Sequence, residues 1–395
     1  MPQRSLPGVF MRGGTSKGLF VDKADLPPEG PARDALILEL LGSPDPMQID
    51  GMGGTFSSTS KVMAVSRSER PGVDVDYLFA QGAITRPVVD YRGNCGNLTS
   101  AIGVYAIDEG LIDEVTEPVT IVELYNENTG VRVRAHIPVV EGRAAVQGDH
   151  AIAGVPRPGA MIRNEFLDPS GSVFDRLYPT GVPRQRLEIS EGSLEVSIVD
   201  VANPVVFLRA SDLGLDGDER PELVNGDEHL LARLEDVRGH AAALLGLVDD
   251  PATAVDVSAS LPMLAIVSGP RDYTTSLDTP VAGGEIDLCA RAVTIQRMHH
   301  AYPMTVLSCT AAAARLPGTI PHELSTHEGT GPVRIGHAKG VAAADVQIDL
   351  GGEEPHVVSV GITRTARRLM AGELYYRTPL ETLDGHPDSP DTTTH

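Results

Sequence analysis

Tryptophan is absent from the 395-residue sequence, and cysteine is rare, with Cys95, Cys289 and Cys309 widely spaced along the chain. An odd, scattered set of cysteines argues against a disulfide framework and is typical of a reducing compartment. The CxxC and HExxH patterns of common zinc sites are also missing, so the sequence predicts no metal. No apolar run approaches the roughly 18 uncharged residues of a membrane span. We therefore expect no contact with a membrane.

Basic residues are also few. The 32 Lys and Arg residues are outnumbered by 54 Asp and Glu residues, which gives a net charge of −22. Such a chain repels phosphate backbones and anionic membrane surfaces, so we expect no nucleic-acid partner. A small anionic ligand would need a locally positive site, built from helix N-termini, backbone N–H groups and a few basic side chains. The N-terminal stretch MPQRSLPGVFMRGG lacks the apolar region of a secretory signal, which favours a cytoplasmic location.

Short runs rich in Val and Ile, bounded by Gly, Pro or Asp, predict strands throughout the chain. These runs are 6–11, 61–66, 75–80, 119–125, 131–140, 194–201, 204–210, 263–269 and 344–350. Helical patterns are fewer, at about 32–41, 97–110, 228–246, 284–299, 305–316 and 363–371. The sequence therefore predicts an α+β protein that is rich in antiparallel strands.

Two weak internal echoes predict that this architecture is duplicated. TSKGLFVDKADL at 15–26 aligns without gaps to ANPVVFLRASDL at 202–213, and LFAQGAIT at 78–85 aligns to LCARAVTI at 288–295. The two echoes occur in the same order along the chain. Both segments of the second echo end about ten residues before a predicted helix of small residues. We expect an N-terminal domain over 1–185, a C-terminal domain over 186–382 and a disordered acidic tail over 383–395.

The first stretch with possible chemistry is MRGGTSKG, residues 11–18. It is not a phosphate loop, because that motif requires the order GxxxxGK[ST], and here Ser16 precedes Lys17. Its small residues could let backbone N–H groups approach an anion, with Arg12 or Lys17 nearby. The alternative is a simple glycine turn between two strands.

The second stretch is FSSTSKVMAV, in which hydroxyl residues lead into Lys61 at the mouth of an apolar strand. A partly desolvated lysine in that position suits a general base. The alternative is a solvated lysine at a strand end.

The third stretch is DYRGNCGNLTSAIGVYAIDEGL, where Cys95 stands at the expected start of a helix, with Asn94 or Asn97 as a cap. The positive end of a helix dipole stabilises a thiolate, although a lone cysteine is more often a small buried hydrophobe. The echo at 78 and 288, extended by the same 210 residues, aligns Cys95 with Thr305. Because no second thiol aligns with Cys95, we expect Cys309 and Cys289 to pack in the core. Lys61 is then the expected partner of Cys95.

At these residues the sequence resembles the 2-methylaconitate cis-trans isomerase (PrpF) family of the diaminopimelate epimerase-like superfamily. The resemblance rests on MRGGTSKG, QIDGMGG with STSKV, GNCGNLTSAIG, NENTG, NPVVFLRASDLG, LPGT, RIGHAKG and RTARRLMAGELY, which together span most of the chain. It implies two similar domains, each a curved and mostly antiparallel sheet around a central helix, with the active site between the two helix N-termini. It also implies proton transfer without a cofactor on small unsaturated di- or tricarboxylates, with Lys61 and Cys95 as the catalytic pair. The epimerase relatives use two facing cysteines, and Thr305 in the second position puts a two-thiol mechanism in doubt.

The expected reaction removes a proton from a carbon next to a conjugated carboxylate and returns it after the dienolate has rearranged. Return of the proton to the same carbon gives cis-trans isomerisation of an aconitate-type acid, which we place first. Delivery of the proton two atoms away gives an allylic shift, as in a 4-oxalomesaconate tautomerase or an itaconate-type isomerase. The expected substrate-binding residues are Arg12, Gly14, Thr15, Ser16, Lys17, Ser58, Thr59, Ser60, Asn94, Gly96, Asn97, Met304 and Thr305.

A biosynthetic isomerase that acts on a less common acid is a further alternative within the family. Two other hypotheses come from different classes of protein. A binding module without catalysis could dispense with Lys61 and Cys95. A cysteine acyl transferase would need a histidine partner, for which only His299 and His300 lie near the second helix. A homodimer is one option for the assembly.

Overall fold

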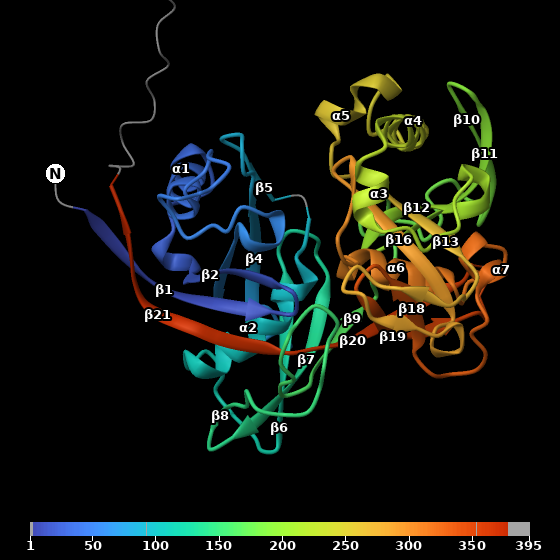
Figure 1. The fold of residues 1–395 in the computed structure, drawn as a ribbon. Helices are drawn as coiled ribbons and strands as arrows, with labels where there is room; N and C mark the ends of the chain where they lie inside the picture. The colour runs from blue at the N-terminus through green and yellow to red at the C-terminus, as the bar shows by residue number, and fades with distance from the viewer. Residues whose placement is uncertain (1–2, 92, 353, 378–395) are drawn as a thin grey trace, which may run out of the picture.

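The computed structural model describes residues 3–91, 93–352 and 354–377. The expected acidic tail over 383–395 lies outside the described residues. Within them the protein is α+β, with a large, mostly antiparallel set of strands and few helices, as the sequence predicts. Figure 1 shows two halves side by side, each with one central helix, α2 (Gly96–Asp108) in the first half and α6 (Met304–Ala313) in the second.

Residues 4–167 form nine strands of the N-terminal half. They are β1 (Arg4–Gly13), β2 (Ser16–Asp22), β3 (Lys61–Arg67), β4 (Val75–Gly82), β5 (Val89–Asp90), β6 (Val119–Asn126), β7 (Arg132–Val140), β8 (Arg143–Ala144) and β9 (Ile162–Leu167). Helix α1 (Pro31–Leu41) packs on the outer face of this sheet, where it buries Leu36, Ile37 and Leu41 against β2 and β3.

The C-terminal half repeats the plan. Its strands are β10 (Gln185–Ile189), β11 (Gly192–Val201), β12 (Asn203–Arg209), β13 (Met263–Ser268), β16 (Leu288–Thr294), β17 (Arg297–Met298), β18 (Val333–His337) and β19 (Gly340–Asp349), with a small separate pair, β14 (Tyr273–Thr274) and β15 (Pro280–Val281). The remaining helices are α3 (Pro221–Asn225), α4 (Glu228–Leu244), α5 (Ala254–Val257) and α7 (Ile320–Leu324). Of these, α4 packs on the outer face of the sheet, as α1 does in the first half.

The strand pairing follows the same order twice. In the first half β2 and β3 are parallel, β3 and β4 antiparallel, β4 and β6 parallel, and β6 and β7 antiparallel. The second half repeats this order of parallel and antiparallel pairs through β12, β13, β16, β18 and β19. The predicted duplication is therefore present in the topology, and both sequence echoes fall on equivalent strands.

The last two strands connect the halves. Strand β20 (His356–Arg364) pairs with β19 on one side and with β9 on the other, and β21 (Ala366–Tyr376) returns to pair with β1 along its length. Figure 1 shows β21 in red running beside β1, far from it in sequence. The expected domain boundary near residue 185 stays a prediction, and these pairings show that residues 356–376 contribute strands to the N-terminal half.

Two of the expected helices are wrong. Residues 284–299 mostly form β16 and β17, because alternate side chains of 288–294 face different parts of the core and all but the last are buried. Residues 363–371 belong to β20 and β21, because pairing with β1 and β9 outweighs the local preference for a helix. The other four expected helices are confirmed as α1, α2, α4 and α6.

The largest hydrophobic core surrounds α2 and α6. Every residue of α6 is buried, and α2 is buried from Leu98 to Ile107, so both helices are enclosed by the core on all sides. Burial of both helices fixes where their N-termini emerge. Among the described residues no helix is both long and apolar enough to cross a membrane. The cytoplasmic location stays a prediction.

Candidate active site

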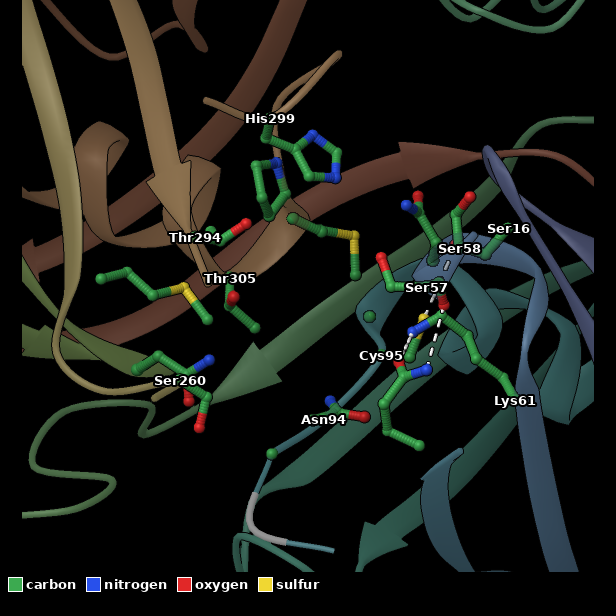
Figure 2. Close-up of a pocket in the computed structure, with 18 of the residues that line it drawn as sticks. Ser16, Ser57, Ser58, Lys61, Asn94, Cys95, Ser260, Thr294, His299 and Thr305 are labelled. Atoms are coloured by element: carbon green, nitrogen blue, oxygen red, sulfur yellow. Dashed lines mark hydrogen bonds between the residues drawn. The ribbon is translucent and has the colours of Figure 1, made fainter. Parts of the chain in front are cut away.

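A cavity of about 190 Å³ lies between the halves, at the N-termini of α2 and α6. Its walls come from both halves: β2, the segment before β3, and the start of α2 on one side, and the starts of β13 and α6 on the other. Figure 2 shows Lys61 and Cys95 on one side of this cavity, with Thr294 and His299 opposite. The cavity thus collects groups from parts of the chain more than 200 residues apart.

Lys61 is the first residue of β3, and its side chain is only 8% exposed. The Nζ atom donates a hydrogen bond to Oε1 of Gln81 at 2.5 Å and lies 4.8 Å from the centre of the Phe79 ring. Gln81 faces Lys61 across the antiparallel pair of β3 and β4, and its own Nε2 donates to the carbonyl oxygens of Ser60 and Gly82. These bonds fix which end of the amide faces the amine.

Cys95 is the N-cap residue of α2 and is also 8% exposed. Its thiol lies 3.8 Å from Oγ of Ser16 and donates toward it. Neither Asn94 nor Asn97 caps the helix, contrary to the prediction: Asn94 Oδ1 accepts from Thr99, and Asn97 Nδ2 donates to Thr15. The first N–H groups of an α-helix have no acceptor within the helix. Because no side chain caps those of α2, they are available to an anion in the cavity.

Helix α6 starts directly opposite α2. A Cβ atom added to Gly96 would lie 2.0 Å from Cε of Met304, so the two first turns are in contact and glycine is the residue that fits. The N-cap of α6 is Pro303, and Thr305 is the second helical residue. Comparison of the caps therefore aligns Cys95 with Pro303, whereas the 210-residue shift aligns it with Thr305. Neither Pro303 nor Thr305 carries a thiol.

The other two cysteines lie in the core. Cys309 is fully buried, its thiol donates to the carbonyl oxygen of Val199 at 3.2 Å, and burial raises its pKa well above the ordinary value. Cys289 is also fully buried, with a pKa raised by burial. Both are therefore inert thiols, and Cys95 is the one that lines the cavity.

His299 supplies a neutral donor on the wall opposite Lys61. Burial and the neighbouring His300 ring lower the pKa of His299 to about 3, so the imidazole is uncharged near neutral pH. The backbone N–H of Ala301 donates to Nδ1 at 3.0 Å. The ring hydrogen of the neutral form therefore sits on Nε2.

Residues 3–377 match the family model described as PrpF protein. The chain belongs to the PrpF family. A 3-methylitaconate isomerase of Eubacterium barkeri is 42% identical over 375 residues, which cover 94% of this chain and 97% of the relative. A 2-methyl-aconitate isomerase of Shewanella oneidensis is 38% identical over 387 residues, covering 94% and 96%. These relatives are isomerases, and the chain is an isomerase.

Solved structures agree with the PrpF assignment. The crystal structure of a methylitaconate-delta-isomerase superposes with a TM-score of 0.84 at 39% identity, covering 98% of this chain and all of the other. A hydroxyproline epimerase from Agrobacterium vitis has the same fold at 11% identity, with a TM-score of 0.54 and coverage of 95% and 94%. The epimerase-like fold that the sequence resemblance implies is confirmed.

Most of the expected site residues of this PrpF-family chain line the cavity. They are Thr15, Ser16, Ser58, Lys61, Asn94, Cys95, Gly96, Asn97, Met304 and Thr305. Their roles stay predictions.

Five expected binding residues lie outside the cavity lining. Arg12 donates to the carbonyl oxygens of Gly14 and Thr365, and Gly14 has φ of +49° in the turn between β1 and β2. Lys17 is exposed, near the Phe10 ring. The hydroxyls of Thr59 and Ser60 bond within their own loop, to Gly54 and Gln48.

Several lining residues were not expected from the sequence: Ser57, Phe79, Gln81, Asp90, Gly93, Asn203, Ser260, Leu261, Met263, Thr294, Ile295, His299, His300 and Pro303. The sequence could have indicated one of them, Asn203, because the alignment of 15–26 with 202–213 places it opposite Ser16. Gln81 becomes visible only through the pairing of β3 with β4.

One acidic group among the described residues has the spacing of metal ligands. Asp216, Asp218 and Glu219 lie together on the C-terminal half, outside the cavity lining, and Arg271 forms ion pairs with both aspartates. Because Arg271 offsets part of their charge and the group lies outside the cavity, we assign no site to it.

Proposed function

We propose that the chain moves a proton on small unsaturated di- or tricarboxylates, with Lys61 and Cys95 as the two proton-transferring groups. The observation that carries the proposal is that an amine and a thiol, both over nine-tenths buried, line one cavity at two helix N-termini. The named relatives act on acids of this class.

The reaction starts with the neutral amine of Lys61, which takes a proton from the carbon allylic to a conjugated carboxylate. The C–H bond breaks, an N–H bond forms, and the electron pair spreads over an extended dienolate. The Cys95 thiol then donates its proton to the other end of the dienolate, which completes a double-bond shift. The ammonium group of Lys61 returns a proton to the thiolate, directly or through solvent, and the pair is restored.

The negative charge of the dienolate needs donors that are already in place. The first N–H groups of α2, at Gly96 and Asn97, and those of α6, at Met304 and Thr305, have no helical acceptors. The Nε2–H of His299 adds a neutral donor. Lys61 is the one lysine or arginine among the described lining residues, so these uncharged donors must bind most of the carboxylate oxygens.

One dienolate leads to either of two products. The 42% identity to a 3-methylitaconate isomerase favours the allylic shift over the cis-trans isomerisation that the sequence led us to place first. The 38% identity to a 2-methyl-aconitate isomerase supports cis-trans isomerisation as the second candidate. In the second case Lys61 returns the proton to its original carbon after the former double bond has rotated.

Proton NMR with a panel of acids tests the proposal. The purified chain is incubated separately with 3-methylitaconate, 2-methylaconitate, trans-aconitate and 4-oxalomesaconate, and each spectrum is followed with time. We expect the highest kcat/KM for 3-methylitaconate, with conversion to the isomer whose double bond joins the two carbons that carry the carboxylates. Faster turnover of 2-methylaconitate would reverse the order of the two candidates, and turnover of none of the acids would contradict the proposed substrate class.

A further inference from the structure

A second cavity, of about 170 Å³, lies behind one wall of the first. Thr15 lines both cavities, and Asn97, which lines the first, is hydrogen-bonded to Arg364, which lines the second. The second cavity has apolar walls that include Ala151, Ala301 and Ala342. None of the described residues that line it is an aspartate or a glutamate. It is therefore a mostly apolar space with one cationic side chain.

Arg364, the last residue of β20, is a buried arginine without an acidic partner among the residues that the structure describes. It is 9% exposed, Nε donates to Oδ1 of Asn97 at 3.1 Å, and Nη1 donates to the carbonyl oxygen of Thr363 at 2.9 Å. Both acceptors are neutral. In the described part of the chain no carboxylate lies within ion-pair distance of Arg364, and its Nη2 has no acceptor. Burial lowers the pKa of Arg364 to about 10, so the group still carries its charge near neutral pH.

Two histidines also line the cavity, together with the hydroxyl residues Thr15, Tyr302 and Thr363. The backbone N–H of Lys339 donates to Nδ1 of His337 at 3.3 Å, and burial lowers the pKa of this ring to about 3. His337 is therefore neutral, with its hydrogen on Nε2. His150 Nε2 is buried and has no hydrogen-bond partner among the described residues. A ligand in the cavity would meet one cation and two neutral imidazoles.

We propose that this cavity binds a short carboxylic acid, with its carboxylate on Arg364 and its carbon chain against the alanines. The guanidinium fork matches the planar carboxylate, and a monoanion balances the single positive charge. Apolar walls with a few convergent polar groups are typical of a site for a carbon skeleton rather than for an inorganic oxyanion. The site is separate from Lys61 and Cys95 and does not depend on their chemistry.

Saturation-transfer NMR with butyrate as the probe tests this site. The Lys61→Gln variant of the full chain removes the one lysine among the described lining residues of the first cavity, so that binding which needs Arg364 but not Lys61 is assigned to the second cavity. We expect saturable butyrate binding in wild type and in Lys61→Gln, and at least a tenfold weaker affinity in Arg364→Gln. Binding that survives in Arg364→Gln, disappears in Lys61→Gln or is absent from wild type would overturn the proposal.

A second variant guards against a misfolded Arg364→Gln. Ala342→Leu fills the cavity and leaves the arginine in place, and circular dichroism confirms that each variant is folded. We expect Ala342→Leu to lose butyrate binding as well. Inorganic phosphate serves as the competing probe, and displacement of butyrate at an equal or lower phosphate concentration would contradict the assignment to carboxylic acids.

Discussion

At the scale of single residues, Gln81 decides where the amine of Lys61 points. Its Oε1 accepts from Nζ at 2.5 Å, while its Nε2 is held by two carbonyl oxygens. Proton transfer depends on the position of the amine within a fraction of an ångström. Gln81 is thus a positioning residue for Lys61.

The Gln81→Leu substitution tests this role. It keeps the size of the side chain but removes the acceptor, so we expect kcat to fall about 10- to 100-fold with a smaller change in KM. Steady-state kinetics on the acid that the NMR panel identifies gives both values. Gln347→Leu, on an exposed position of β19, is the matched control and should leave both unchanged. An unaltered kcat in Gln81→Leu would show that Lys61 needs no such support.

The sequence indicates Lys61 and Cys95 because each stands at a local boundary that the pattern marks, a strand mouth and a helix start. Gln81 and His299 carry no such mark. Their place in the cavity follows from strand pairing and from the loop before α6, which depend on contacts distant in sequence. Strand alternation explains why Lys17, which follows Ser16 in β2, does not line the cavity, because successive strand residues point to opposite faces. Arg12 faces Lys17 across the pair of β1 and β2 and so lies on the same face as Lys17.

At the scale of elements, the turn between β1 and β2 packs directly on the first turn of α2. A Cβ atom on Gly13 would lie 2.4 Å from the carbonyl oxygen of Asn97 and 3.0 Å from Cα of Leu98. Both neighbours are backbone atoms that cannot rotate away. The glycines of MRGGTSKG therefore serve close packing of the hairpin against the helix that carries Cys95.

Gly13→Ala should accordingly destabilise the protein. The added methyl group forces the hairpin away from α2, and we expect the free energy of unfolding to fall by about 1 to 3 kcal/mol. Urea denaturation followed by circular dichroism measures this. Gly284→Ala is the matched control, because nothing lies within 4 Å of its added Cβ, and it should change stability by less than about 0.5 kcal/mol. Equal stability of both variants would contradict the packing account.

Elements were predicted best where one pattern dominates. Each of the nine expected strands lies on an observed strand, because runs of Val and Ile between glycines and prolines admit few other structures. The errors at 284–299 and 363–371 lie in segments whose local sequence also suits a helix. Long-range pairing decided both, since β16 lies between β13 and β18, and β21 pairs along β1.

At the scale of the whole molecule, the two halves share a topology but differ in chemistry. Lys61 begins β3, and Met263 begins the equivalent strand β13; Cys95 caps α2, and Pro303 caps α6. All four line the cavity. Duplication therefore supplies two facing helix N-termini, while both of the side chains that we propose to transfer the proton come from the N-terminal half. A homodimer stays a prediction.

Stability should fall in acid because of His337. Its pKa is about 3 in the folded state, from burial and the nearby Arg291 and Arg364 charges, against 6.5 in an exposed ring. The unfolded chain therefore binds more protons between these values, so stability is full above pH 6.5 and is lost as pH falls toward 3. Between pH 7 and pH 4.5 this histidine should contribute a loss of about 2 kcal/mol.

His337→Asn removes this contribution, because the amide oxygen can accept the Lys339 bond without titrating. Urea midpoints measured at pH 7 and pH 4.5 should differ less in the variant than in wild type. The exposed His322→Asn variant is a suitable comparison, because its ring sits on the short helix α7 outside both cavities. An identical pH dependence in His337→Asn and wild type would contradict the assignment.

The central claim, that Lys61 and Cys95 move the proton, is tested most directly by deuterium exchange in D₂O. Each variant is incubated with the accepted acid, and loss of the allylic proton signal is followed by NMR. We predict that Lys61→Ala slows exchange at least about 1000-fold. Cys95→Ser should retain some exchange but lose conversion to product. Lys23→Ala is the control, because it removes a lysine that pairs with Glu127 outside the cavity, and it should match wild type. Exchange at the wild-type rate in the Lys61→Ala Cys95→Ser double variant would contradict the claim.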